Sequence, residues 1–291
     1  MKVAKNTRVA FQGERGAFSE EAAVKLLGSE VALVPFPTFE AAFGAIAEGK
    51  ADYILAPIEN SLAGPVHRSF DLLVEGPLTI VGEVIIPIVH NLIGPPGGRF
   101  EEVAIVESHP VALAQCERFF SARPLLKRIA TDDTAGSVRE IVQAGDRKRA
   151  AIASKRAAEI YDGQILREHL EDDPENYTRF LLLAPPTEKS PAGADKLSLV
   201  FRLEHLPGAL FQALEPFARR KINLMKIESR PVRGLPWQYR FYLDLQTSAQ
   251  APETVAALGE LEKFAVDVRI LGSYVSAKNE TQLHRNFGER S

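Results

Sequence analysis

The strongest constraint on the fold is a regular alternation of short apolar runs with helical patterns between residues 9 and 184. This alternation is typical of an α/β domain with a largely parallel sheet, because helices return the chain between neighbouring strands. A shorter pattern at residues 197–274 predicts the order β-α-β-β-α-β, the ferredoxin-like arrangement. The sequence therefore predicts two domains, as expected for a chain of 291 residues.

The expected elements of the first domain follow from its apolar periodicity. We expect strands at 9–11, 31–35, 53–57, 78–89, 103–107, 125–129, 150–153 and 180–183, and helices at 19–27, 39–48, 66–73, 110–120, 134–143 and 155–161.

The first domain is expected to have two lobes. The long strand at 78–89 precedes a turn-rich stretch and carries the chain into a second lobe, which runs from about residue 85 to residue 170. A strand that begins at Arg179 returns to the first lobe. The domains are expected at 1–185, for the two-lobed α/β domain, and 196–275, for the ferredoxin-like domain, with a linker at 186–195 and a flexible tail at 276–291.

The composition argues against several partners. With 35 Lys and Arg against 38 Asp and Glu, the net charge of -3 gives no general attraction to nucleic acid or to an acidic membrane surface. The N-terminus lacks the apolar segment of a secretory signal, and no apolar stretch approaches the ~20 residues of a membrane span. Cys116, the one cysteine of the chain, is expected to be a small core residue. We expect a cytoplasmic protein.

The motifs of metal and nucleotide sites are missing from the sequence. The six histidines show no pairing at the spacing of metal ligands, and there is no paired cysteine set. The glycine patterns that bind dinucleotides or ATP, and the nucleophile motif of α/β hydrolases, do not occur. We therefore expect neither a metal nor a cofactor.

The tripeptide Thr178-Arg179-Phe180 opens an apolar run directly after an acidic, turn-rich stretch. Arg offers a planar fork of donors to a carboxylate, and Thr offers a rotatable hydroxyl. The pair suits a small anionic substrate that loses a hydroxyl group. Alternatively, the two are an edge-strand Thr and a surface Arg.

Several helix starts place a Ser or Thr next to the expected first turn, at Ser19, Ser61, Ser108 and Thr134. A capping hydroxyl together with free backbone N–H groups favours an anion, and two such sites facing each other would suit a dicarboxylate. Asn60 and Ser61 follow a buried strand, at the edge where open α/β sheets bind ligands. Glu59 is either a general acid or an ion-pair partner of Arg68 or Arg179.

The second domain offers two further motifs. Gly208 lies where a strand turns into a helix, which allows close approach of a ligand or of neighbouring backbone. Glu228-Ser229-Arg230-Pro231 ends the following strand. Both can also be read as turn chemistry alone.

In their order and spacing, these motifs resemble prephenate dehydratase with an appended ACT domain, over residues 8–274. The resemblance rests on seven segments: Gly16-Ala17-Phe18-Ser19-Glu20, Pro57-Ile58-Glu59-Asn60-Ser61, Ser108-His109-Pro110, Asp133-Thr134-Ala135, Thr178-Arg179-Phe180, Gly208-Ala209-Leu210 and Glu228-Ser229-Arg230-Pro231. It implies a two-lobed, periplasmic-binding-protein-like catalytic domain followed by a ferredoxin-like ACT regulatory domain. It also implies the decarboxylating dehydration of prephenate to phenylpyruvate in phenylalanine biosynthesis.

The resemblance assigns roles to particular residues. The catalytic threonine of the family falls on Thr178, and we expect Arg179, Glu59, Asn60 and Ser61 to complete the catalytic set. Expected substrate-binding residues are Ser19, Ser108, Thr134 and Phe180. Expected binding residues for phenylalanine, the effector, are Gly208, Ala209, Leu210, Asn223, Glu228, Ser229 and Arg230.

Two alternatives remain open at this stage. Phe11-Gln12-Gly13 and Val66-His67-Arg68 depart from the bacterial pattern, and the second resembles plant arogenate dehydratases, so the substrate is either prephenate or arogenate. A noncatalytic amino-acid sensor is the competing class. A homodimer or homotetramer is expected, because a small domain with an exposed sheet edge usually pairs.

Overall fold

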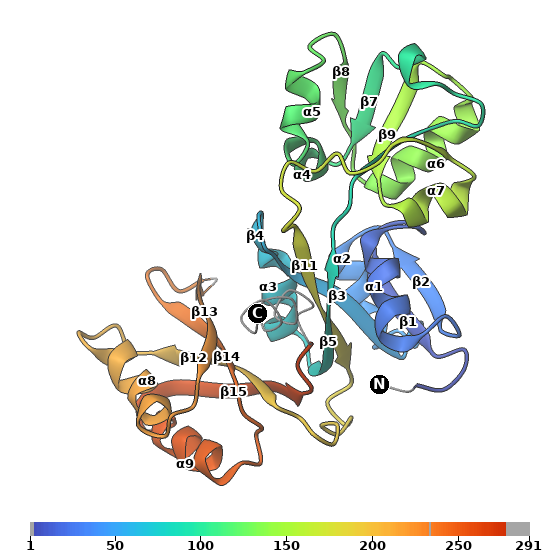
Figure 1. The fold of residues 1–291 in the computed structure, drawn as a ribbon. Helices are drawn as coiled ribbons and strands as arrows, with labels where there is room; N and C mark the ends of the chain where they lie inside the picture. Colours follow the sequence, from blue (N-terminus) through green and yellow to red (C-terminus); the bar gives the residue numbers. More distant parts are fainter. Residues whose placement is uncertain (1–2, 233, 278–291) are drawn as a thin grey trace, which may run out of the picture. The chain divides into compact units, whose positions relative to one another are not determined.

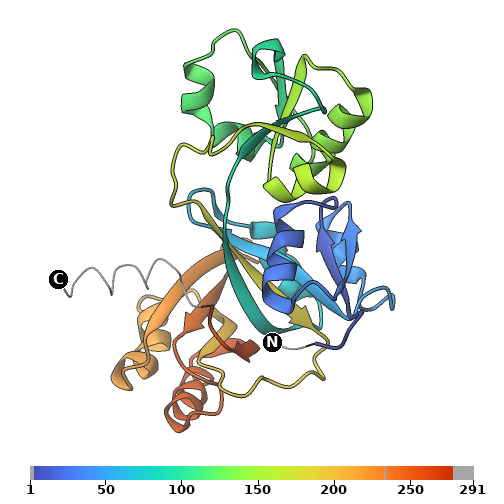
Figure 2. The same cartoon turned by 45° about the vertical axis from the view of Figure 1, so that its right-hand side comes forward.

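The computed structural model describes residues 3–232 and 234–277 (Figures 1 and 2). The chain divides into two compact units, the first formed by Met1–Leu72 and Val84–Leu181, the second by Leu73–Glu83 and Leu182–Ser291. Within the described ranges, the helices are too short or too polar for any of them to cross a membrane.

The first lobe is built on a six-stranded sheet in the order β2-β1-β3-β11-β5, with β4 paired to β3. β1 pairs in parallel with both β2 and β3, as the alternating pattern predicts. The strands are β1 (Arg8–Gln12), β2 (Ala32–Phe36), β3 (Tyr53–Asn60), β4 (Gly64–Pro65), β5 (Thr79–Pro87) and β11 (Tyr177–Ala184).

The second lobe has a five-stranded sheet in the order β10-β6-β9-β7-β8. The β7–β8 and β7–β9 pairs are parallel, whereas β6 pairs antiparallel with β9 and β10, so this sheet is mixed. Its strands are β6 (Asn91–Gly94), β7 (Ile105–Ser108), β8 (Lys127–Ala130), β9 (Arg149–Ala153) and β10 (Gln164–Arg167).

The helices of the two lobes fill the connections between strands. They are α1 (Phe18–Leu27), α2 (Phe39–Gly44), α3 (His67–Glu75), the short 3-10 helix η1 (Phe100–Glu102), α4 (Pro110–Ala114), α5 (Glu117–Ser121), α6 (Thr134–Ala144) and α7 (Lys155–Tyr161). Small side chains such as Ala135, Ala157 and Ala158 are buried against the second sheet together with Val138 and Ile141.

Two segments connect the lobes, one after β5 and one before β11 (Figure 1). They are hydrogen bonded to each other: Ile88 N–H donates to the Asn176 carbonyl at 2.8 Å, and Leu170 N–H donates to the His90 carbonyl at 2.8 Å. The expectation of a two-lobed α/β domain is thereby confirmed.

The second unit contains β12 (Lys196–Leu203), α8 (Ala209–Arg219), β13 (Leu224–Pro231), β14 (Tyr239–Leu245), α9 (Pro252–Leu261) and β15 (Ala265–Tyr274). Its sheet has the order β13-β14-β12-β15, and the β12 pairs with β14 and β15 are antiparallel. This is the predicted ferredoxin-like arrangement. The tail expected at 276–291 lies outside the described residues from residue 278 onward.

The predicted hydroxyl caps are wrong at all four positions, since Ser61 lies in a turn before β4 while α3 begins only at His67. The N-caps of α1, α4 and α6 are Ala17, His109 and Asp133, so Ser19 and Thr134 lie inside their helices and Ser108 precedes the cap. The Asp133 carboxylate accepts from Gly136 N–H at 2.6 Å. Aspartate is as good a cap as serine, and only the backbone geometry decides between neighbouring candidates.

The helix expected at 110–120 is divided into α4 and α5. The break has a long-range cause, because the Asp172 carboxylate accepts from Glu117 N–H at 2.7 Å and from Arg118 N–H at 2.9 Å. Asp172 N–H also donates to the Gln115 carbonyl at 2.7 Å. A residue of the returning segment therefore caps α5 and holds Gln115 at the break.

Candidate active site

A cavity of about 460 Å³ lies within the first unit. Residues of both lobes line it, including Ser19 and Asn60 from the first and Gln115 and Thr134 from the second. Its size is that of a small-molecule site, which is usually a concave pocket with a few convergent polar groups.

Asn60 is the central polar residue of this cavity. Its Oδ1 accepts from Leu62 N–H at 3.0 Å and from Ala63 N–H at 2.7 Å, in the turn that follows β3. Its Nδ2 donates to the Asn176 Oδ1 at 2.8 Å and to the Thr178 Oγ1 at 2.9 Å. Two backbone donors thus fix which side of the amide faces Thr178.

Thr178 lies near the start of β11, lines the cavity and is 8% exposed. Because its oxygen accepts from Asn60, the Thr178 hydroxyl proton is directed to another acceptor. The arrangement suits donation toward a ligand in the cavity.

A chain of hydrogen bonds continues from Asn60 into the second lobe. Asn176 Nδ2 donates to the Gln115 Oε1 at 3.0 Å, and His90 Nε2 contacts the same oxygen at 2.8 Å. His90 and Asn176 are 2% and 1% exposed. Burial lowers the pKa of His90, although the bond to Gln115 and the charge of Glu171 act in the opposite direction. The ring is therefore neutral near pH 7.

Two helix N-termini open on the cavity. Phe18 and Ser19 begin α1 of the first lobe, and Thr134 begins α6 of the second. Backbone N–H groups at a helix start and the helix dipole together favour an anion. A ligand with two negative groups can therefore be held from both lobes.

The lobes contact each other beside these helix starts. Ser154 Oγ donates to the Gly16 carbonyl at 2.7 Å, and Arg156 bonds the buried Glu20 carboxylate at 3.1 Å. Arg15 also bonds Glu20, at 2.7 Å. Burial alone would raise the pKa of Glu20, but these hydrogen bonds and one from Gly16 N–H lower it below its ordinary value. Glu20 is thus an ionised bridge between the lobes.

The expected catalytic residues have different positions. Asn60 and Thr178 line the cavity, and so do the expected substrate-binding residues Ser19 and Thr134. Ser61 fixes the backbone, since its Oγ donates to the Glu175 carbonyl at 2.7 Å and accepts from Tyr177 N–H at 2.9 Å.

Five expected residues are not among the described residues that line this cavity: Ser61, Glu59, Ser108, Phe180 and Arg179. Ser108 Oγ donates to the Ile152 carbonyl at 2.6 Å, and Phe180 is 1% exposed in the core. Successive strand residues point to opposite faces, so Arg179 turns away from the face that presents Thr178.

Sequence reasoning missed three residues of the network, His90, Gln115 and Asn176. Asn176 could have been found, because it lies two positions before Thr178 and directly precedes β11, where an extended chain turns residues two apart to the same side. His90 and Gln115 gave no local signal, since the contacts that bring them together join segments far apart in the sequence. The described part of the chain contains no group of three or more His, Cys, Asp or Glu side chains that could hold a metal ion.

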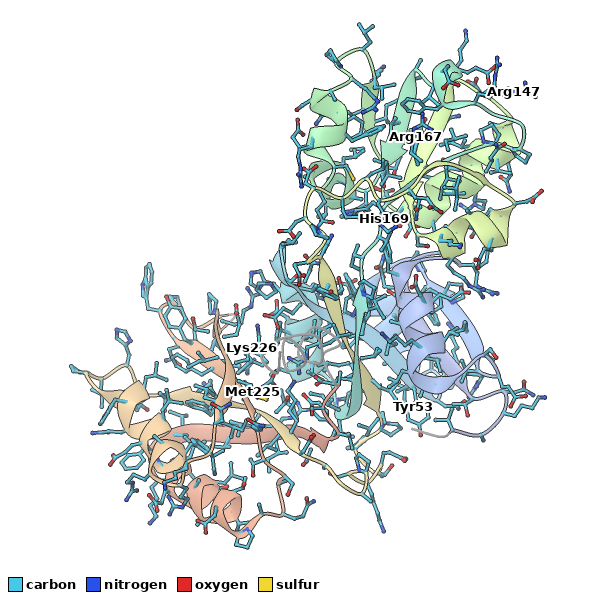
Figure 3. All side chains as sticks on the ribbon, viewed as in Figure 1. Tyr53, Arg147, Arg167, His169, Met225 and Lys226 are labelled. Atoms are coloured by element: carbon cyan, nitrogen blue, oxygen red, sulfur yellow. The ribbon has the colours of Figure 1, made fainter. Side chains whose placement is uncertain are left out.

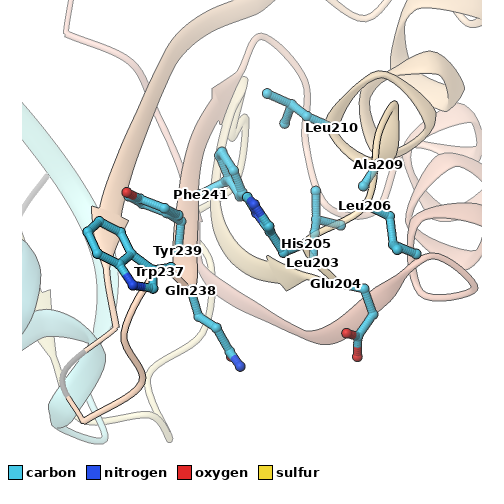
Figure 4. Close-up of a pocket in the computed structure, with 10 residues that line it drawn as sticks. All are labelled: Leu203, Glu204, His205, Leu206, Ala209, Leu210, Trp237, Gln238, Tyr239 and Phe241. Atoms are coloured by element: carbon cyan, nitrogen blue, oxygen red, sulfur yellow. The ribbon is translucent and has the colours of Figure 1, made fainter.

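The second unit has a cavity of about 170 Å³ at the start of α8 (Figure 4). Ala209 and Leu210, both expected to bind the effector, line it together with Trp237 and Tyr239. Gly208 is the N-cap of α8 with a φ of 80°, a conformation that glycine adopts readily.

The other expected effector residues are not among the lining residues of this cavity. Asn223 Nδ2 donates to the Gln246 Oε1 at 3.1 Å. Glu228, Ser229 and Arg230 are on the edge strand β13. On this strand Met225 and Lys226 are adjacent (Figure 3), and Met225 is 50% exposed.

Comparison with known proteins covers both units. The family model described as prephenate dehydratase matches residues 9–188, and the ACT domain model matches residues 197–263. Arogenate dehydratase/prephenate dehydratase 2 of Arabidopsis thaliana, a chloroplastic protein, is 44% identical over 277 residues, covering 92% of this chain and 72% of the relative.

Two solved structures have a TM-score of 0.85 to this chain. One is the prephenate dehydratase of Arthrobacter aurescens in complex with L-Phe, 31% identical, with 92% of this chain and 90% of that chain covered. The other is GqqA, described as a novel type of quorum quenching acylase, 33% identical, with 93% and 98% covered. The chain therefore belongs to the prephenate dehydratase family and carries a C-terminal ACT domain.

Proposed function

We propose that this protein is a dehydratase that converts prephenate to phenylpyruvate, with arogenate as the alternative substrate. The observation that carries the proposal is the Thr178 hydroxyl, whose oxygen accepts from Asn60 Nδ2 at 2.9 Å inside a cavity lined by both lobes. A hydroxyl held in this way is a directed hydrogen-bond donor.

The substrate carries a carboxylate on its ring and a second one on its side chain. We assign one carboxylate to the start of α1 and the other to the start of α6. Each helix start contributes about 0.3 to 1 kcal/mol toward a charge, and up to about 2 kcal/mol where it is partly buried. The carboxylate that leaves as CO2 is thus bound without the strong stabilisation that would oppose its loss.

The reaction breaks two bonds. The bond between the ring and its carboxylate breaks, its electron pair enters the ring, and the C–O bond of the ring hydroxyl breaks at the opposite carbon. The oxygen leaves with a proton as water, and the ring becomes aromatic. Thr178 donates a hydrogen bond to this departing oxygen as the bond breaks and keeps its own proton, while the proton that completes the water comes from solvent. Such assistance is typically worth about 10² to 10⁴ in rate.

Positioning supplies much of the remaining effect, because the two lobes hold both ends of the substrate. Asn60 donates a hydrogen bond to the Thr178 oxygen, and Gln115 adds an amide from the second lobe. The roles that the sequence suggested for Arg179 and Glu59 are not part of this proposal, since neither lines the cavity.

The ACT domain supports regulation by phenylalanine. One solved relative was obtained in complex with L-Phe. We assign the effector to the second unit, near Ala209 and Leu210 at the start of α8. A Ser229→Ala variant tests whether the edge strand takes part, and feedback that stays unchanged would remove β13 from the effector site.

The homodimer or homotetramer and the cytoplasmic location stay predictions.

The proposal is tested by incubating the purified protein with prephenate and, separately, with arogenate. Product formation is followed by the ultraviolet absorbance of phenylpyruvate and by chromatography of phenylalanine. We expect turnover of at least one substrate. Binding of amino acids without turnover of either would assign the protein to the sensor class. Acylase activity in the same preparation, with neither product formed, would assign it to the activity for which GqqA is named.

A further inference from the structure

His90 is a buried histidine at the edge of the active-site cavity whose role the proposed reaction leaves open. It lines the cavity and is 2% exposed. The His90 backbone N–H donates to the Glu171 carboxylate at 2.8 Å. The Phe18 ring packs edge-on against the His90 ring, with 5.8 Å between the two centroids. Within the described ranges, its Nδ1 is buried without a hydrogen-bond partner.

The position of the proton on the His90 ring follows from the hydrogen bonds of the network. Leu62 and Ala63 donate their backbone N–H groups to Asn60, so the accepting atom of Asn60 is its oxygen and Nδ2 is the donor. Asn60 Nδ2 donates to Asn176, which makes the Asn176 acceptor an oxygen and leaves its Nδ2 as the donor to Gln115.

The next hydrogen bond of the network involves His90. The Gln115 atom that accepts from Asn176 is its oxygen, and the same oxygen lies 2.8 Å from His90 Nε2. Since a carbonyl oxygen only accepts, Nε2 carries the proton of the neutral ring. The N–H groups of Leu62 and Ala63 thus determine the tautomer of His90. Their effect passes along the hydrogen bonds of Asn60, Asn176 and Gln115.

These hydrogen bonds also orient the amino group of Gln115. The Gln115 oxygen accepts from Asn176 and His90. The amino group of the same amide therefore points away from these two donors. Gln115 lines the cavity. A rotated amide would present an oxygen to an anionic ligand. We propose that His90 is a positioning residue, which through its Nε2–H fixes the Gln115 amide so that the amino group donates to a carboxylate of the substrate. This inference rests on the proposed function.

Two substitutions distinguish the role of the His90 Nε2 from that of its Nδ1. The amide of His90→Gln reaches the position of Nε2 and can still donate to Gln115, whereas the shorter amide of His90→Asn lies near Nδ1 and cannot. We expect His90→Asn to raise KM about 10- to 100-fold, the effect of one hydrogen bond to a charged group, while kcat changes less. His90→Gln is expected to recover most of that loss.

A double-mutant cycle tests whether His90 acts through Gln115. In a Gln115→Met background, His90→Asn should raise KM little further, because the group it positions is already missing. As a matched control, His169→Gln changes an exposed histidine that contacts the other oxygen of Glu171, and it should leave KM unaltered. Full additivity, or recovery by His90→Asn in place of His90→Gln, would overturn the proposal.

The nitrogen-15 shifts of the His90 ring give a readout that needs no turnover. We expect the Nε2-protonated tautomer in the free protein and a mixture of tautomers in Gln115→Met. A ring protonated at Nδ1 in the unsubstituted protein would refute the positioning role even if the enzyme is active. Absence of turnover on both substrates, with the expected tautomer, would instead count against the proposed function alone.

Discussion

At the scale of single residues, the direction of each hydrogen bond in the cavity is set by the backbone. Asn60 accepts from two main-chain N–H groups and therefore donates to Thr178 and Asn176. The sequence placed Asn60 and Thr178 in the site through their motifs. It also placed Arg179 there, but the alternation of a strand turns neighbouring residues to opposite faces, so Arg179 and Thr178 cannot share one.

Replacing Asn60 by Asp tests this direction with almost no change in shape. Asp retains the oxygen that accepts from the backbone but has no N–H for Thr178, so its second oxygen would accept the Thr178 proton. We expect kcat to fall by about 10²- to 10⁴-fold, the usual value of proton donation, in a folded protein. Kinetics on the preferred substrate, with circular dichroism as the folding control, measure the effect. A kcat near that of the unsubstituted enzyme would contradict the assigned direction.

At the scale of elements, local patterns located most strands and helices, but long-range contacts decided their ends. The helix expected at 110–120 breaks because Asp172, which lies far along the chain, caps α5 and bonds the Gln115 carbonyl. The short strands β6 and β10 were not predicted as separate elements. Each has four residues and acquires its pairing only from the sheet.

Gly16, in the turn before α1 of the first lobe, lies close to the backbone of the second lobe. A Cβ on Gly16, whose φ is +86°, would lie 2.8 Å from the Ala157 Cα, whereas one on Gly28, at φ +89°, would meet nothing within 4 Å. Gly28→Ala therefore measures the strain of the backbone alone. The Gly28 backbone has a ψ of 173°, in a region open essentially only to glycine. We therefore expect Gly28→Ala to cost about 1 to 3 kcal/mol of unfolding free energy, and Gly16→Ala to cost about 1 to 3 kcal/mol more because of overpacking.

Urea unfolding of the two alanine variants measures both free energies. Equal losses at the two positions would show that the lobes do not press against each other at Gly16.

At the scale of the whole molecule, the second unit includes residues far apart in the chain. Lys196, the first residue of β12, bonds the two Glu83 carboxylate oxygens at 2.9 and 3.0 Å, and both side chains are buried. Arg269 of β15 donates to the carbonyls of Val74 and Gly76 at 2.9 and 2.7 Å. The pattern at 197–274 and the linker indicated a separate second domain, but not that residues 73–83 belong to its unit.

The Glu83–Lys196 pair gives a stability prediction for this unit. Lys196→Met leaves a buried carboxylate without its cation and should destabilise the protein by about 3 to 5 kcal/mol. Adding Glu83→Leu should recover part of that loss, since two apolar residues can replace a buried pair. Denaturant unfolding of the single and double variants checks this. A double variant less stable than Lys196→Met would mean that Glu83 has another essential role.

In the proposed reaction the Thr178 hydroxyl, directed by Asn60, assists the departure of the ring hydroxyl. The most direct test of this role is the turnover of prephenate or arogenate by Thr178→Val beside Thr178→Ser. We expect kcat of the valine variant to fall by about 10²- to 10⁴-fold, while the serine variant stays within about tenfold of the unsubstituted enzyme. Near-normal turnover by a folded Thr178→Val would contradict this role.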